Sequence, residues 1–220
     1  MEDTEWKLRC DLAACHHLFH HFGWTDVIFT HLSVRLPQHK NHYLTTPYGL
    51  MFDEVTASNL VNMNAGHAIH TAIMKTRQNV NCTLHSHTRA GIAVSCMQEG
   101  LMNLSQQSGE IQDKINYYDY HLLEDPNTAA CARLGRDIGN KPLLIMRNHG
   151  LLSAANNIPE ALYNLYVLEN ACKIQVDVLR TGAELSVPPK SEWDKLAKIN
   201  VSPTNDVAEH VNLFWTALLR

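Results

Sequence analysis

Hydrophobic residues recur at helical spacing in several stretches of the chain. Over residues 4–22 they fall at intervals of three and four, from Leu8 to Phe22, which places them on one face of a helix. The same spacing predicts a long helix over residues 159–180, and its opening proline suits a first helical turn. Shorter helices are expected over residues 53–61, 65–77, 88–98, 126–138, 191–199 and 205–219, with another opening at 105–108.

Shorter apolar runs between these stretches predict strands. They cover residues 27–36, 41–46, 115–118 and 142–147, together with a strand that begins at Cys82. Turn residues separate the first of them, among them Pro37 and the segment Thr46–Gly49. Strands that alternate with helices favour a mixed α/β domain, in which a sheet carries helices on its faces. We expect residues 1–220 to form one domain, with residues 182–220 as a C-terminal helical extension.

Histidines follow two of the predicted strands. One strand leads into His85 and His87, and another leads into His149 and Gly150. Residues i and i+2 of a strand point to the same side, so His85 and His87 can present two imidazoles to one point. With His149 they predict a three-histidine site for a divalent metal such as Zn(II), Mn(II), Fe(II) or Co(II). The alternative is a chance His-x-His pair, because the chain contains 14 histidines.

The charge and the cysteines narrow the class of protein. A formal net charge of −4 gives no electrostatic reason to expect nucleic acid or an anionic membrane as partner. The N-terminal residues are acidic and lack a signal-peptide pattern, and no apolar run reaches the roughly 18 residues of a membrane span. The six cysteines are scattered without a C-x-x-C pair, which is typical of reduced core thiols. We therefore expect a cytoplasmic protein.

Several motifs together resemble the class II aldolase/adducin family, and the likeness extends through most of the chain. The family's N-x-S-x-R strand is similar to Phe29–Arg35, and its I-T-P-x-G turn is similar to Leu44–Gly49. Its H-[TS]-H metal motif is similar to Leu84–His87, and its third-ligand segment is similar to Arg147–Leu151. Phe52–Leu60 and Ser105–Gln107 resemble a bacterial subgroup. The resemblance implies a three-layer α/β/α sandwich around a mostly antiparallel sheet. It also implies a homo-oligomer, expected to be a tetramer with active sites at subunit interfaces.

The resemblance further implies roles for individual residues. Ser33, Thr46 and Gly49 correspond to the turns that hold the substrate phosphate in the family's sugar-phosphate aldolases. Those aldolases bind Zn(II), which polarises the substrate carbonyl. Zn(II) is therefore the metal we expect first, with Mn(II) or Fe(II) as alternatives. The corresponding metal ligands in this chain are His85, His87 and His149.

The chain departs from those aldolases at three points. Counted back from His85 without gaps, the position of their catalytic glutamate is Gly66. His31 replaces the asparagine of N-x-S-x-R, and no tyrosine follows Tyr166, whereas the aldolases use a C-terminal tyrosine. The family's helix histidine remains as His70. We take His31 and His70 as candidate catalytic residues, because histidine titrates near neutral pH. Hydrogen bonding within the strand, for His31, and packing, for His70, are the alternatives.

These observations favour a metal-dependent lyase that cleaves a carbon–carbon bond in a small carbonyl or hydroxy-acid substrate. Glycine at position 66 cannot move a proton. This favours decarboxylation over an aldol reaction, because decarboxylation needs no base to start. A non-haem Fe(II) oxygenase on the same fold is one alternative, since three histidines leave positions open for dioxygen and substrate. A non-catalytic, adducin-like oligomeric interaction module is the other.

Overall fold

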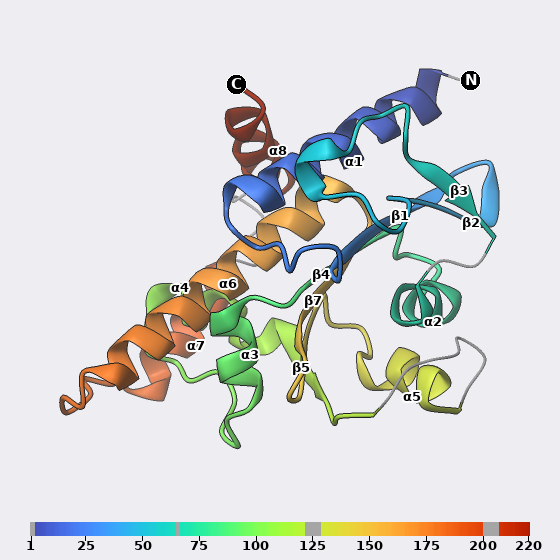
Figure 1. Cartoon of the computed structure of the whole chain (residues 1–220). Helices are drawn as coiled ribbons and strands as arrows, with labels where there is room; N and C mark the ends of the chain where they lie inside the picture. Colours follow the sequence, from blue (N-terminus) through green and yellow to red (C-terminus); the bar gives the residue numbers. More distant parts are fainter. Residues whose placement is uncertain (1–2, 65–66, 122–128, 200–206) are drawn as a thin grey trace.

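A seven-stranded mixed sheet forms the centre of the molecule (Figure 1). The computed structural model describes residues 3–64, 67–121, 129–199 and 207–220. The strands are β1 (His31–Leu36), β2 (His39–Thr45), β3 (Val61–Met63), β4 (Cys82–Ser86), β5 (Ile115–Tyr118), β6 (Leu143–Met146) and β7 (Gly150–Ala155). They lie in the order β3-β2-β1-β4-β7-β6-β5, and among the described strands only β5 and β6 pair in parallel.

Helices lie on both faces of this sheet (Figure 1). They are α1 (Asp3–His21), α2 (Ala68–Thr76), α3 (Arg89–Ser95), α4 (Gln106–Ile111), α5 (Ala129–Asp137), α6 (Ile158–Arg180), α7 (Lys190–Ile199) and α8 (Val207–Leu218). Two short 3-10 helices, η1 (Phe52–Glu54) and η2 (Gln112–Lys114), complete the described elements. No helix within the described ranges is long and apolar enough to cross a membrane.

Two apolar cores separate the three layers. On one face, Leu12 of α1 and Leu165 of α6 belong to the same buried cluster as Leu84 of β4. On the other face, Ile73 of α2 belongs to a second buried cluster with Leu152 of β7. Leu84 and Leu152 point to opposite faces, because side chains alternate along strands. The expected α/β/α sandwich with a mostly antiparallel sheet is therefore confirmed.

The prediction of a helix over residues 53–61 is wrong. Only η1 is helical there, and the chain then forms a turn and enters β3 at Val61. Thr56 and Asn59 close this turn reciprocally, since the backbone N–H of each donates to the side-chain oxygen of the other. Such local side-chain bonds offer the backbone an alternative to helix formation.

Other parts of the chain also differ from the expectation, among them β3, which was not predicted. The first strand begins at His31 rather than at residue 27, because residues 27–29 form a turn in which the Phe29 N–H donates to the Asp26 carbonyl. Strand β7, directly after His149, was not predicted. The expected start of a helix at residue 126 lies outside the described residues, although α5 covers much of its remaining length.

Candidate metal centre

Three histidine side chains converge beside the central strands. His85 is the fourth residue of β4, and His87 follows that strand by one residue. His149 lies in the turn that joins β6 to β7, and its N–H donates to the Met146 carbonyl. The Nε2 atom of His85 lies 2.8 Å from that of His87 and 3.2 Å from that of His149. The remaining separation, His87 to His149, is 3.0 Å. The predicted triad is therefore brought together at a single point.

The outer nitrogens of two of these rings fix their tautomers. The Nδ1 atom of His85 lies 2.8 Å from the Leu151 carbonyl oxygen, and that of His87 lies 3.1 Å from Asp26 Oδ2. Both partners are acceptors, so each Nδ1 carries the hydrogen and each neutral ring keeps an Nε2 lone pair. Two lone pairs cannot hydrogen-bond to each other. A cation between them satisfies both, which is the arrangement of histidine ligands oriented by second hydrogen bonds.

The spacing and the charge state both suit a metal ion. Ligand nitrogens about 2.05 Å from a tetrahedral Zn(II) lie roughly 3.3 Å apart, close to the separations in this triad. Burial, followed by the nearby His149 and His87, holds the pKa of His85 well below its usual range. Burial and His87 lower the pKa of His149 to about 4. Near pH 7 these two rings are therefore neutral, and a metal does not have to displace a proton from them.

The backbone around the third histidine depends on a glycine. A Cβ atom on Gly150 would overlap the Ser86 carbonyl oxygen and would lie 3.2 Å from His87 Cδ2 and 3.4 Å from His85 Cε1. The preceding residue, Asn148, adopts a φ of +56°, a left-handed conformation that asparagine tolerates better than most residues. The sequence Asn148-His149-Gly150 therefore lets β7 approach β4 closely enough for the three rings to meet.

Asp26 is positioned by a strained turn. Its neighbour Val27 adopts a φ of +52°, which is unfavourable for a β-branched side chain and costs about 1–3 kcal/mol. The turn brings the Asp26 carboxylate to His87, while the Val27 side chain is left exposed. Sequence reasoning missed Asp26, because it lies 61 residues before its partner and in no recognisable motif.

A second group of imidazoles adjoins the triad. His31 pairs with His85 across β1 and β4, and the two ring centroids lie 5.2 Å apart. His31 Nδ1 lies 3.1 Å from Nε2 of His70, whose Nδ1 lies 2.8 Å from Ser33 Oγ. His67 stacks on His31 with a centroid separation of 3.8 Å. The two candidate catalytic histidines are thus linked by a hydrogen bond, and His67 is an addition that the sequence analysis did not single out.

Burial keeps this group uncharged. Burial is the main cause that holds the pKa of His31 well below its usual range, with His70 and His67 as further causes. The pKa of His70 is lowered in the same way by burial and by His67. Neutral imidazoles can donate through one nitrogen and accept through the other. The series His31, His70 and Ser33 can therefore pass a hydrogen along without forming a buried charge.

Comparison with known proteins identifies the family of this chain. A family model described as "Class II Aldolase and Adducin N-terminal domain" matches residues 10–176. The chain belongs to this family. A candidate class 2 aldolase of Pseudomonas aeruginosa is 39% identical, and the match covers 99% of this chain and 89% of that protein. Alpha-adducin of Mus musculus is 37% identical over 80% of this chain, which corresponds to 26% of the adducin. A crystal structure of an aldolase II superfamily protein from Pseudomonas syringae has a TM-score of 0.92 at 36% identity and covers 100% of this chain and 93% of its own.

The predicted substrate-binding residues Ser33, Thr46 and Gly49 differ in their surroundings. Ser33 is fully buried, and its hydroxyl is hydrogen-bonded to His70. Gly49 is exposed with a φ of +104°, and Thr46 Oγ1 is buried without a protein partner. The candidate position of the family glutamate, Gly66, lies outside the described residues. Among the described side chains, Ser33 is the one predicted substrate-binding residue that is hydrogen-bonded to a candidate catalytic residue.

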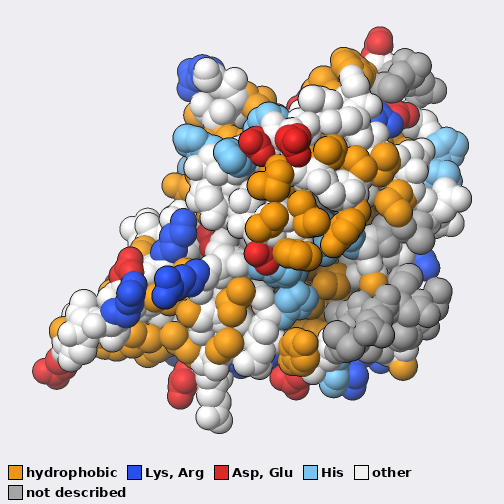
Figure 2. All heavy atoms as spheres, viewed as in Figure 1, with side chains coloured by type: hydrophobic (Ala, Val, Ile, Leu, Met, Phe, Trp, Pro, Cys, Tyr) orange, Lys and Arg blue, Asp and Glu red, His pale blue; other side chains and the backbone are white. Residues whose placement is uncertain are grey.

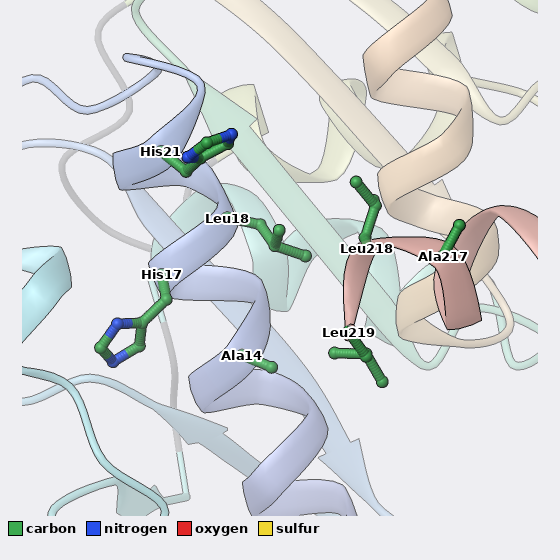
Figure 3. Close-up of a pocket in the computed structure, with 7 residues that line it drawn as sticks. All are labelled: Ala14, His17, Leu18, His21, Ala217, Leu218 and Leu219. Atoms are coloured by element: carbon green, nitrogen blue, oxygen red, sulfur yellow. The ribbon is translucent and has the colours of Figure 1, made fainter.

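A separate groove runs between the first and last described helices. Figure 3 shows its lining from α1 and from the end of the chain: Ala14, His17, Leu18, His21, Ala217, Leu218 and Leu219. The groove shares no residue with the histidine triad. Its polar side chains are His17 and His21, and His17 Nε2 is already hydrogen-bonded to the Val55 carbonyl. The groove therefore carries no chemistry that competes with the triad as the candidate site.

Proposed function

We propose that this class II aldolase family member is a metal-dependent lyase that cleaves a carbon–carbon bond next to a carbonyl group. The convergence of three Nε2 atoms within 3.2 Å of one another carries the proposal. His85, His87 and His149 would hold a divalent ion, most simply Zn(II), with Mn(II) or Fe(II) as alternatives. When bound, such an ion supplies Lewis acidity that stabilises negative charge developing on a substrate carbonyl oxygen.

His31 and His70 are proposed to handle the proton. In one hydrogen-bond direction, Ser33 donates to His70 and His70 donates to His31 Nδ1, which leaves a hydrogen on His31 Nε2. In the other direction His31 Nδ1 donates to His70, and His31 Nε2 becomes an acceptor. His31 Nε2 can therefore give a proton to the carbon left by bond cleavage, and a proton taken up from solvent then restores the neutral ring.

Decarboxylation of a small acid that carries a carbonyl group β to its carboxylate, with or without a further hydroxyl group, is the reaction we favour. In that step the bond to the carboxylate carbon breaks, carbon dioxide leaves, and the electron pair moves into the carbonyl group. The carbon is then protonated. No base is required at the start, which agrees with a glycine at the position of the aldolase glutamate. Ser33, Thr46 and Gly49 stay proposed substrate contacts, with Gly49 the most open of them.

We propose that the sites lie at interfaces of a homo-oligomer, expected to be a tetramer. Val27 and Phe29 precede β1, and Tyr48 and Met51 follow β2, so two neighbouring strands carry these apolar side chains near their ends. All four are exposed, Tyr48 to 78%. Figure 2 shows hydrophobic side chains gathered in the middle of one face, with histidine side chains beside them. Apolar patches of this kind commonly mark interaction surfaces.

Assays of carbon dioxide and aldehyde release test the lyase. The protein would be loaded in turn with Zn(II), Mn(II) and Fe(II) and offered panels of hydroxy acids, keto acids and sugar phosphates. The expected result is turnover that requires metal and is lost in His149→Ala. Oxygen uptake with Fe(II), without release of either product, would instead identify an oxygenase. Panels without any metal-dependent turnover would count against the lyase.

A non-catalytic interaction module is the second candidate function. The 37% identity to alpha-adducin favours it, although the matched part is about a quarter of that protein. In this case the chain would form a stable oligomer that binds no stoichiometric metal. Light scattering on the purified protein, combined with its metal content, separates the two candidates.

A further inference from the structure

A carboxylate is buried behind the strand that carries the first two histidines. Glu169 lies in the middle of α6 and has no exposed surface. Glutamate is almost never fully buried unless it is paired, because a charge loses its hydration there. Burial accordingly raises the pKa of Glu169, and hydrogen bonds from Ser86 and Thr88 oppose that shift. The Glu169 carboxylate therefore loses its hydration on folding, and its hydrogen bonds have to offset that cost.

The hydrogen-bond partners of Glu169 alternate with the two histidines along the chain. The Ser86 hydroxyl donates to Glu169 Oε1 over 2.6 Å. The Thr88 hydroxyl lies 2.9 Å from Oε1 and 2.7 Å from Oε2 of the same carboxylate. In the sequence, His85, Ser86, His87 and Thr88 alternate, and side chains along a strand alternate between its two faces. One carboxylate thus holds the residue between the histidines and the residue after them.

Thr88 extends this contact into the next helix. Its Oγ1 atom accepts a hydrogen bond from the Gly91 N–H, over 3.1 Å, and so caps the start of α3. Glu169 is therefore joined to both the end of β4 and the start of α3. The backbone of residue 87 lies between these two anchors, and its direction is restricted from both sides.

We propose that Glu169 is a positioning residue for metal binding, which sets the orientation of His85 and His87 through Ser86 and Thr88. This inference rests on the proposed metal site. A contribution to stability is a weak explanation for the carboxylate, because replacing a buried ionic group together with its partners by apolar side chains is often neutral or stabilising. Second hydrogen-bonded layers around a metal site typically change affinity by 10- to 100-fold when they are removed.

Zn(II) affinity, measured by competition with a chromophoric chelator, tests the proposal in variants of the whole chain. Glu169→Leu removes both anchors and should weaken affinity about 10- to 100-fold. Glu169→Gln keeps an oxygen that both hydroxyls can reach, and it should stay within about threefold of the wild type. Ser86→Ala removes one anchor from the other side and should give an intermediate loss.

Gln175 offers a matched control on the same helix. It is buried, and its amide bonds the Gly100 carbonyl and the Met102 N–H instead of the metal strand. Gln175→Leu therefore removes the partner of the Gly100 carbonyl and of the Met102 N–H, as Glu169→Leu removes the partner of two hydroxyls. Urea unfolding shows how much stability each variant loses. The proposal expects Gln175→Leu to bind Zn(II) like the wild type, even where its stability falls as far as that of Glu169→Leu.

The outcomes separate this inference from the proposed function. Selective weakening in Glu169→Leu and Ser86→Ala supports it. Unchanged affinity in folded Glu169→Leu overturns it while leaving the metal site intact. Should Glu169→Leu fail to fold, unchanged affinity in Ser86→Ala overturns it equally. A wild-type protein that binds no Zn(II) would overturn the metal site itself, and the inference with it.

Discussion

The Asp26 carboxylate lies 3.1 Å from Nδ1 of His87, on the side of the ring opposite to the triad. This contact leaves the Nε2 lone pair of His87 directed at His85 and His149, whose Nε2 atoms lie 2.8 and 3.0 Å away. The contact is made by a turn that contains a valine in a strained conformation. A strained residue beside a candidate site is a common sign that local geometry serves function.

Removal of the Asp26 carboxylate is expected to weaken metal binding. Asp26→Ala should raise the Kd for Zn(II) about tenfold, because His87 loses the partner that fixes its ring. Asp26→Asn should have a smaller effect, since its amide oxygen still accepts from Nδ1. Asp53 is the matched control, because it approaches His20 at 3.9 Å and has similar exposure. Isothermal titration of all three variants would refute the role of Asp26 if Asp26→Ala and Asp53→Ala bind alike.

Any side chain at Gly150 should damage the site. Gly150→Ala places a methyl group against the Ser86 carbonyl and the rings of His85 and His87. We expect a loss of about 1–3 kcal/mol in the free energy of unfolding, together with weaker Zn(II) binding. Gly182→Ala serves as a control for metal binding, since Gly182 has open surroundings and a positive φ that Gly150 lacks. Equal metal affinity in the two variants would show that β4 and β7 can shift to accommodate the added methyl group without damage to the metal site.

His31 should be required for turnover and dispensable for metal binding. We expect His31→Asn to lower kcat by about 100-fold or more, because an amide cannot take the proton-transfer role of an imidazole. Its metal content should stay that of the wild type. His42→Gln removes a surface histidine of β2 that bonds Asn62, and it should change neither quantity. A His31→Asn enzyme with normal kcat would assign His31 a structural role.

A buried histidine far along α1 should make stability depend on pH. His16 is fully buried, and burial lowers its pKa to about 4. The unfolded chain therefore binds a proton at His16 more readily than the folded chain does. The part of the free energy of unfolding that depends on a neutral His16 is complete above about pH 6.5 and is lost as the pH falls towards 4. The expected loss is about 3 kcal/mol for this group. Urea unfolding from pH 7 to pH 4 should show a smaller loss in His16→Leu; equal losses in both proteins would contradict this.

The metal triad could be predicted because its signals are local. A buried strand carries a continuous apolar run, and the histidines after Leu84 and Met146 stand where such runs end. The partners that orient the rings could not be predicted in the same way. Asp26 and Glu169 lie 61 and 83 residues from the atoms they bond, and a hydrogen bond over that distance leaves no periodicity in a sequence.

The missed elements have local explanations. The apolar run after His149 belongs to a second strand, β7, which returns beside β6 through a tight turn. Its strand character is not distinguishable by periodicity from any other short apolar run. The error over residues 53–61 arose because Thr56 and Asn59 exchange side-chain hydrogen bonds with each other's backbone. A threonine that could cap a helix instead closes a turn with a nearby asparagine.

The metal content of the purified protein tests the central claim most directly. The chain would be purified without oxygen and without chelator, beside a His85→Ala/His87→Ala control, and both would be measured by mass spectrometry. The account predicts about one divalent ion per chain in the wild type, Zn(II) in the first instance, and loss of that ion in the control. Absence of metal from both samples, or equal metal in both, would contradict a site built by His85, His87 and His149.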